Sequence, residues 1–280
     1  MAVKCTALFP HPPLAVEEIG GRELKKAAYT VEGFKKTAEE ISQIDDLDLL
    51  VMITPHGPVF RSAASIIIKD SLKGDFSDFS YPQIKFEKKS DPYFAEKIFK
   101  NCKKEGLALQ ALKDNELQKY DIKNELDHGL MVPLYYLKKA GIDLPIIPIS
   151  IGFISHDKLY KIGKKIKETA EKEDYNIAVI ASGDLSHRLK KGAPAGYHPK
   201  AHLFDEKLLE LLQKKEFKSV LNLDNDLIEN AGECGLRPIV MMLGSIDSEQ
   251  IEVELNSYEG PFGVGYANVF MKVKEKAVVK

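Results

Sequence analysis

The chain has 280 residues, 44% of them hydrophobic, and its 40 lysines and arginines nearly balance its 42 aspartates and glutamates. This length and composition are ample for a packed core, in one large α/β domain or in two small ones. The lysines are spread along stretches with helical spacing, and the sequence has no basic block interleaved with aromatic residues. That distribution argues against nucleic acid or an anionic membrane as the main partner.

The N-terminal sequence MAVKCTALFPHPP has too short an apolar stretch for a signal peptide, and no run approaches the length of a membrane span. We therefore expect a cytoplasmic protein. The three cysteines, Cys5, Cys102 and Cys234, are far apart and form no CxxC pair. This usage suits a reducing compartment, and it excludes a disulfide framework or a zinc site made of cysteines alone.

Seven runs are predicted to form strands, and four lysine- and glutamate-rich segments with helical spacing lie between them. The strand-like runs are residues 3–9, 47–54, 63–69, 144–152, 176–182, 251–258 and 264–273. The helical segments are residues 23–42, 91–106, 155–174 and 200–215. The alternation predicts an α/β fold with a central, mainly parallel or mixed sheet flanked by helices on both faces. Residues 69–90 are predicted to form a long excursion or a hairpin, and residues 274–280 a tail or the start of a linker.

Two histidines directly follow predicted strands and are flanked by prolines. His56 comes after the run at 47–54 and lies between Pro55 and Pro58 in ITPHGPVF, and His11 follows the first strand in FPHPP. Prolines end strand pairing and fix the backbone. Because ligands of open α/β sheets bind beyond the carboxyl ends of the strands, both histidines are candidate site residues.

Two more histidines lie at predicted element boundaries. His187, in SGDLSHR, follows the strand at 176–182 after a glycine turn, and His128, in LDHG, opens an apolar helix. The acids near them also have structural interpretations. Asp127 could be a helix-start partner of His128, and the side chain of Asp184 could hold the turn by a bond to the backbone instead of orienting a histidine. The remaining histidines are interpreted as a neighbour of a helix cap or as residues of the site rim: His156, His198 and His202.

Paired histidines need a third ligand if they bind a metal, and Glu233 in ENAGECGLRP is the candidate. Two neutral imidazoles and one carboxylate hold Fe(II) and leave open positions for a catecholate and dioxygen, while a histidine removes a catechol proton. Two alternatives stay open: Glu233 as the cap of the following helix, and Cys234 as a thiolate ligand instead of a buried filler. A zinc hydrolase site made of Asp184, His187 and Glu233 is a third interpretation.

Six motifs in order resemble the class III extradiol ring-cleavage dioxygenases, the LigB-like catalytic subunit type of protocatechuate 4,5-dioxygenase. The motifs are FPHPP, TPHGP, LDHG, SGDLSH, AGECGLRP and GPFGVGY. The resemblance covers nearly the whole chain and implies a single α/β domain over residues 1–273. It also implies a homodimer that opens a catecholic or related small aromatic ring with O2.

The same resemblance implies a role for each candidate residue. A non-haem Fe(II) ion is held by His11, His56 and Glu233. His187 is the catalytic base, and His128 is a second catalytic histidine near the substrate and oxygen.

Within this family, the chain resembles a dioxygenase-like domain found beside or fused to a small partner domain, in gene neighbourhoods with a Memo-type protein and a radical enzyme. Memo proteins share the scaffold but have a cysteine where the dioxygenases have the glutamate, and ECG at 233–235 presents both. A His, His, Cys set favours copper or zinc, whereas His, His, Glu favours iron. The AGECG form favours Glu233 and an Fe(II) dioxygenase. The alternative is a Memo-like copper or zinc domain that acts in protein modification or redox signalling.

Overall fold

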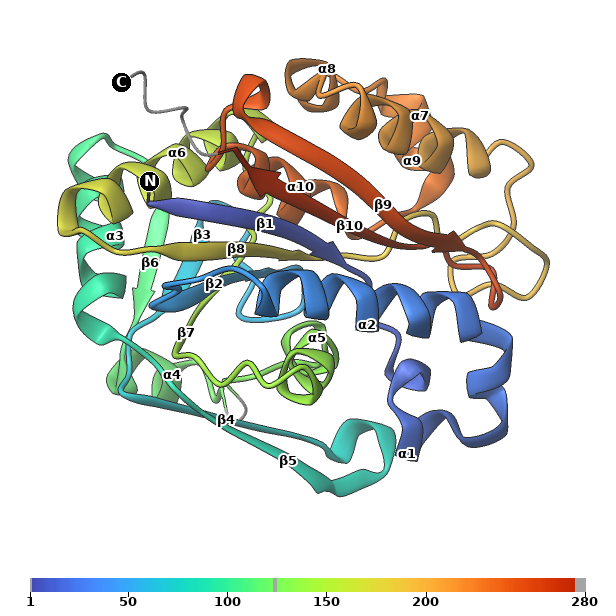
Figure 1. Cartoon of the computed structure of the whole chain (residues 1–280), viewed down its shortest axis with the longest axis horizontal. Helices are drawn as coiled ribbons and strands as arrows, with labels where there is room; N and C mark the ends of the chain where they lie inside the picture. The colour runs from blue at the N-terminus through green and yellow to red at the C-terminus, as the bar shows by residue number, and fades with distance from the viewer. Residues whose placement is uncertain (1, 123–124, 275–280) are drawn as a thin grey trace.

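The computed structural model describes residues 2–122 and 125–274, and most of them form one layered α/β unit (Figure 1). Its centre is an eight-stranded sheet. In spatial order the strands are β6 (Leu109–Leu112), β3 (Ala64–Ile67), β7 (Ile146–Ser150), β2 (Leu49–Thr54), β8 (Ile177–Ser182), β1 (Val3–Phe9), β10 (Tyr266–Val273) and β9 (Ile251–Glu259). A separate hairpin consists of β4 (Ser71–Phe76) and β5 (Tyr81–Lys89).

Ten α-helices and four short 3-10 helices are assigned within the described residues. The α-helices are α1 (Glu17–Gly20), α2 (Ala28–Ser42), α3 (Pro92–Lys104), α4 (Asp114–Lys119), α5 (His128–Lys139), α6 (His156–Glu173), α7 (His202–Gln213), α8 (Phe217–Leu221), α9 (Asn225–Ala231) and α10 (Leu236–Leu243). The 3-10 helices are η1 (Pro13–Ala15), η2 (Gly21–Ala27), η3 (Ser77–Phe79) and η4 (Ser248–Gln250).

The sheet is mixed, with a parallel centre. Strand β2 pairs in parallel with β7 and β8, and β8 pairs in parallel with β1. Strands β10 and β9 add antiparallel pairs beyond β1, and β3 runs antiparallel to β7. The carboxyl ends of β1, β2, β7 and β8 therefore meet at one edge of the sheet. The predicted fold class, a single α/β domain with a central mixed sheet, is confirmed.

Each face of the sheet has its own hydrophobic core. On β1, Leu8 belongs to one core, whereas Ala7 and Phe9 belong to the other, because successive side chains of a strand point to opposite faces. Helices α2 and α5 cover one face, and α3, α6 and α10 cover the other (Figure 1). The central strands are buried on both sides, which explains their almost continuous apolar sequence.

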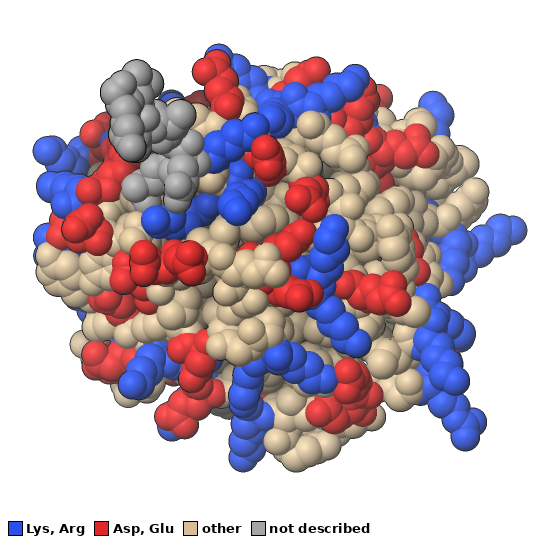
Figure 2. Space-filling model, viewed as in Figure 1, with Lys and Arg blue, Asp and Glu red and all other residues tan. Residues whose placement is uncertain are grey.

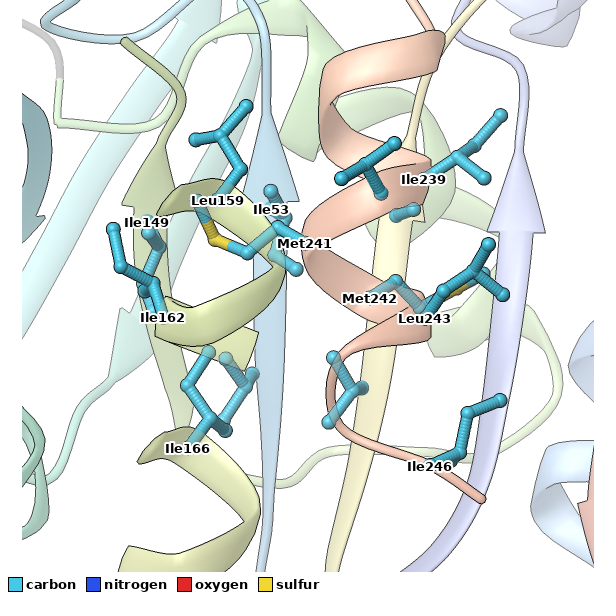
Figure 3. Packing of buried hydrophobic residues seen from close by; sticks show 14 of the residues in the cluster. Ile53, Ile149, Leu159, Ile162, Ile166, Ile239, Met241, Met242, Leu243 and Ile246 are labelled. Atoms are coloured by element: carbon cyan, nitrogen blue, oxygen red, sulfur yellow. The ribbon is translucent and has the colours of Figure 1, made fainter. Parts of the chain in front are cut away.

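Helix α10 is fixed tightly against α6, and this contact places the segment that precedes α10. Figure 3 shows the two helices side by side over the sheet, with Ile162 beside Ile149 and Met241 beside Ile53. The helices come so close at Gly163 that a Cβ atom there would lie 1.9 Å from the backbone oxygen of Met241. Only glycine allows this approach.

All seven predicted strands are present, and the excursion at 69–90 contains the β4–β5 hairpin. The sequence prediction missed β6, which has only four residues and alternates too briefly to stand out. The first part of the helix predicted at 23–42 is the 3-10 helix η2. The predicted tail lies outside the described residues, except for Lys274.

Charged side chains of both signs are interspersed over the face shown in Figure 2. Ion pairs join neighbouring turns of surface helices, such as Lys161 with Asp157 and Lys214 with Glu210. Among the helices that the structure describes, none is both long and apolar enough to cross a membrane.

Candidate metal centre

Three of the predicted site histidines meet at the carboxyl edge of the sheet. His11 follows β1, His56 follows β2, and His128 is the first residue of α5. The ring centroids are 4.7 Å apart for His11 and His56, 4.3 Å for His56 and His128, and 5.3 Å for His11 and His128. His187 follows β8. Burial lowers the pKa of His11 and of His56, and the proximity of His187 lowers both further.

Among the residues that the structure describes, one group of side chains could hold a cation: His11, His56 and Cys234. Their ligand atoms all lie within 4.8 Å of one another. The Nε2 atoms of the two histidines are 3.0 Å apart, and the sulfur of Cys234 is 3.5 Å from Nε2 of His11. Two nitrogens and one sulfur thus converge, which is a donor set that suits zinc or copper.

Glu233 does not belong to that group. Its Oε2 accepts the backbone N–H of Leu236 at 2.6 Å and so satisfies a buried amide at the start of α10 that has no partner within the helix. Burial raises the pKa of this carboxyl to about 7. Of the two interpretations of the sequence, the structure shows the helix-cap contact. The assignment of Glu233 as a metal ligand stays a prediction.

His11 is held at its backbone and at its ring. Its N–H donates to Oδ1 of Asp184 at 2.8 Å, and its Nδ1 lies 2.9 Å from the hydroxyl oxygen of Ser182. The side chain of Asp184 therefore orients a histidine loop and does not simply hold its own turn. Oδ2 of Asp184 lies 3.7 Å from Nε2 of His11, where its charge, once the carboxyl is ionised, favours a bound cation. Burial raises the pKa of Asp184 to about 7.

The half-buried side chain of Asp127 connects the loops of His56 and His128. Its Oδ1 accepts the Thr54 hydroxyl and the Gly129 N–H, both at 2.8 Å. The Thr54 hydroxyl oxygen in turn accepts the N–H of His56 at 3.2 Å. The contact with Gly129 caps α5, so the same carboxylate fixes the helix that begins with His128. The sequence indicated only the helix-start pair and gave no sign of the link to His56.

The pKa of each of the four histidines is lowered, which favours the neutral imidazole at pH 7. Burial lowers the pKa of His56 to about 4 and that of His128 to about 4. The pKa of His11 is well below its usual value because of burial and then the neighbouring histidines, and burial also lowers the pKa of His187. Neutral imidazoles are the form that binds metals. Burial, followed by the charges of Asp184 and Glu233, raises the pKa of the Cys234 thiol, so this ligand must lose a proton when it binds a cation.

The ring of His187 is oriented by the backbone. Its Nδ1 lies 2.8 Å from the carbonyl oxygen of Leu185. Because a carbonyl only accepts, the neutral ring carries its proton on Nδ1, and Nε2 is left as a base. Ser186, which precedes His187, donates its N–H to the buried carboxylate of Asp205 at 2.8 Å. The Tyr258 hydroxyl donates to the same carboxylate at 2.7 Å. Sequence analysis missed Asp205: an aspartate on the apolar face of α7 is unusual, but the sequence does not show which groups it contacts.

The residues around the histidines have varied positions. Phe79, from the hairpin, packs edge-on against His128 with ring centroids 5.2 Å apart, so the 69–90 excursion does reach the histidines. Tyr197 is exposed, and Arg188 donates to the carbonyl oxygen of Glu229. His202 begins α7, and His156 begins α6 with Nδ1 3.3 Å from the carbonyl oxygen of Leu221. His198 lies in the preceding loop and is bonded through its N–H to the carbonyl of Arg188.

Several known proteins are similar to this chain. Protein CA_C1420 of Clostridium acetobutylicum is 36% identical over 92% of the chain, which spans only 55% of that protein's length. The 3,4-dihydroxyphenylacetate 2,3-dioxygenase of Escherichia coli is 23% identical over 84% of the chain and 86% of the enzyme. A MEMO1 family protein of Pyrococcus furiosus is 29% identical over 54% of the chain and 58% of that protein.

The fold is also found in a solved structure. The uncharacterized protein JW3007 of Escherichia coli K12 superposes with a TM-score of 0.62 and 16% identity, over 95% of this chain and 99% of that one. A family model described as the catalytic LigB subunit of aromatic ring-opening dioxygenase matches residues 5–270. This match includes every residue of the histidine and cysteine cluster, and the chain therefore belongs to the LigB family.

Proposed function

We propose that this chain is a metal-binding protein of Memo-like type in which His11, His56 and Cys234 hold one copper or zinc ion. The observation that carries the proposal is the convergence of the three side chains, with all ligand atoms within 4.8 Å of one another. A sulfur ligand favours these metals over iron bound by a carboxylate. The MEMO1 family relatives support the proposal.

The residues around the cluster prepare it for a cation. His11 and His56 are neutral, and their Nε2 atoms face each other at 3.0 Å. Asp184 contributes negative charge 3.7 Å from Nε2 of His11, and Cys234 gives up its proton on binding. When bound, copper supplies one-electron redox chemistry and zinc supplies a Lewis acid. In this function the centre serves redox signalling or the modification of a partner protein.

A second function, extradiol ring opening, is favoured by the two further histidines. The neutral imidazoles of His128 and His187 lie beside the two candidate metal ligands, His11 and His56. Nε2 of His187 can take the proton of a substrate hydroxyl. The similarity to a ring-cleaving dioxygenase over 84% of the chain supports it. Here Fe(II) is held by His11, His56 and Glu233, the substrate is a catecholic or related small aromatic compound, and O2 is the second reactant. Glu233 must then leave the Leu236 N–H, at a cost of about 1–3 kcal/mol for an unpaired buried amide.

A matched pair of variants separates the two functions, because the two candidate third ligands are adjacent in the sequence. Metal content is measured on protein purified without added metal, for the wild type, Cys234→Ala and Glu233→Gln. A glutamine keeps an oxygen that accepts the Leu236 N–H, so the helix cap survives in that variant. We expect copper or zinc in the wild type and in Glu233→Gln, and its loss in Cys234→Ala. Full metal occupancy in Cys234→Ala would contradict the thiolate centre.

The second function has its own assay. Each protein is loaded anaerobically with Fe(II), mixed with a panel of catechols and exposed to air. A yellow ring-opened product that is lost in Glu233→Gln and retained in Cys234→Ala would support the dioxygenase. If no member of the panel gives the product, ring opening of catechols is refuted.

A further inference from the structure

The hydroxyl group of Ser182 lies between the ring of His11 and a backbone carbonyl. Ser182 is the last residue of β8, between β2 and β1 in the sheet (Figure 1), and it is completely buried. Its Oγ lies 2.9 Å from Nδ1 of His11 and donates to the carbonyl oxygen of Gly129. Neither contact is local in sequence, since Ser182 is 171 residues from His11 and 53 residues from Gly129.

Counting protons leaves one consistent arrangement. A serine hydroxyl has a single proton, and a carbonyl oxygen can only accept. The Ser182 proton therefore goes to Gly129, and Oγ must accept the hydrogen bond from His11. The neutral His11 ring then carries its proton on Nδ1, and the lone pair of Nε2 faces His56 and Cys234.

The other partners of Nε2 do not reverse this preference, because Nε2 of His56, at 3.0 Å, and the thiol of Cys234, at 3.5 Å, can each donate a hydrogen bond to it. Oδ2 of Asp184 is 3.7 Å from Nε2 of His11, beyond hydrogen-bonding distance. Asp184 therefore holds the backbone of His11 but does not hold a proton on Nε2. We propose that Ser182 is the positioning residue that fixes His11 in the metal-binding tautomer.

The acceptor on the far side of Ser182 is itself fixed. The N–H of Gly129 donates to Asp127, which also accepts the hydroxyl of Thr54. A Cβ atom at Gly129 would lie 2.6 Å from the Thr54 hydroxyl oxygen, so only glycine fits between these groups. Since Thr54 also accepts the N–H of His56, one continuous set of hydrogen bonds joins both histidine ligands. Hydrogen bonds of this kind commonly orient metal-binding histidines and tune their affinity.

The inference rests on the proposed function only in that His11 binds a metal, which both candidate functions share. Its first test needs no metal. Protein labelled with 15N-histidine is stripped with a chelator, and long-range 1H–15N correlation spectra report the tautomer of each neutral imidazole at pH 7. The His11 signals are assigned by their absence in His11→Gln. We expect a protonated Nδ1 and a bare Nε2 in the wild type, and a mixture of tautomers in Ser182→Ala.

The matched control is Ser245→Ala. Ser245 is also completely buried, and its hydroxyl also donates to a backbone carbonyl, that of Met242, but it lies past the far end of α10. The Ser245→Ala variant therefore removes the same kind of hydrogen bond without touching a histidine. An unchanged His11 tautomer in Ser182→Ala would overturn the proposal.

The second measurement is metal affinity, determined by competition with a chromogenic chelator for Zn²⁺. We expect Ser182→Ala to weaken binding by about 10- to 100-fold and Ser245→Ala to change it by less than about two-fold. An equal loss in both variants would show a general packing effect and overturn the proposal. If wild-type protein bound no metal at all, the proposed function would fail, while the tautomer spectra would still decide the role of Ser182.

Discussion

Replacing Asp205 by asparagine is expected to change how the stability of this protein depends on pH. Asp205 is completely buried, and burial raises the pKa of its carboxyl from the ordinary value of 3.8 to about 7. The folded protein thus binds a proton that the unfolded chain releases between these two pH values. The resulting stabilisation is fully present below pH 3.8 and is lost as the pH rises through about 7.

The size of the stability change follows from the difference between the pKa of Asp205 in the folded protein and its ordinary value. Each pKa unit corresponds to about 1.4 kcal/mol, so ionising Asp205 costs the folded state on the order of 4 kcal/mol once the pH is above 7. Asparagine avoids this cost and keeps both contacts. Its oxygen accepts the Ser186 N–H, and its amide group donates to the Tyr258 hydroxyl.

The assay is urea unfolding of the wild type and Asp205→Asn from pH 4.5 to 8. We expect the free energy of unfolding of the variant, relative to wild type, to increase steadily as the pH rises to about 7. Glu206→Gln is the comparison variant: it removes from the exposed side of the same helix a charge that also raises the pKa of Asp205, so it should change the pH dependence far less than Asp205→Asn. If the difference between Asp205→Asn and wild type is the same at every pH, the ionisation argument is refuted.

Three further predictions concern the core, the cap of α5 and the metal centre. Phe34 stacks between Phe9 and Tyr136, so Phe34→Ala should lower the free energy of unfolding by about 3–5 kcal/mol in urea titrations while zinc affinity is retained. Gly129→Ala places a Cβ against Thr54 and should cost about 1–3 kcal/mol, with weaker metal binding as a second readout; unchanged values of both would contradict the close packing. Because the buried Cys234 thiol is protonated, metal binding at pH 7 should release about one proton per ion, measured by calorimetry in buffers of different ionisation enthalpy. Cys234→Ala lacks the thiol, so it should neither bind the ion nor release this proton, and equal binding and equal release by both proteins would exclude the thiol as the source.

The strands and the two proline-flanked histidines could be predicted because their signals are local. The apolar runs of β1 and β2 end directly before FPHPP and TPHGP, and strand ends are where α/β proteins place their ligands. Strand β6 could not be predicted in this way, because four residues carry too little periodicity. In ECG, the sequence presents two possible ligands side by side, and only the fold shows Glu233 bonded to Leu236 and Cys234 beside His11.

The supporting residues were beyond sequence analysis for a different reason. Ser182 contacts His11 across 171 residues, and Asp205 in α7 accepts the backbone N–H of Ser186 in the loop after β8. Serine and aspartate are common at strand ends and in helices, so neither residue type marks a site. Their roles follow from which donors and acceptors the tertiary structure brings together.

The sulfur of Cys234 and the ring of His11 are separated by 223 residues of chain. An ion held between them would act as a reversible cross-link between the first strand and the segment that enters α10, at the cost of ordering only a few side chains. At a free-ion concentration of 100 times Kd, such a link adds about 2.7 kcal/mol to the stability of the whole domain. A change in the concentration of that ion would thus alter the stability of the folded domain as well as the occupancy of its metal centre.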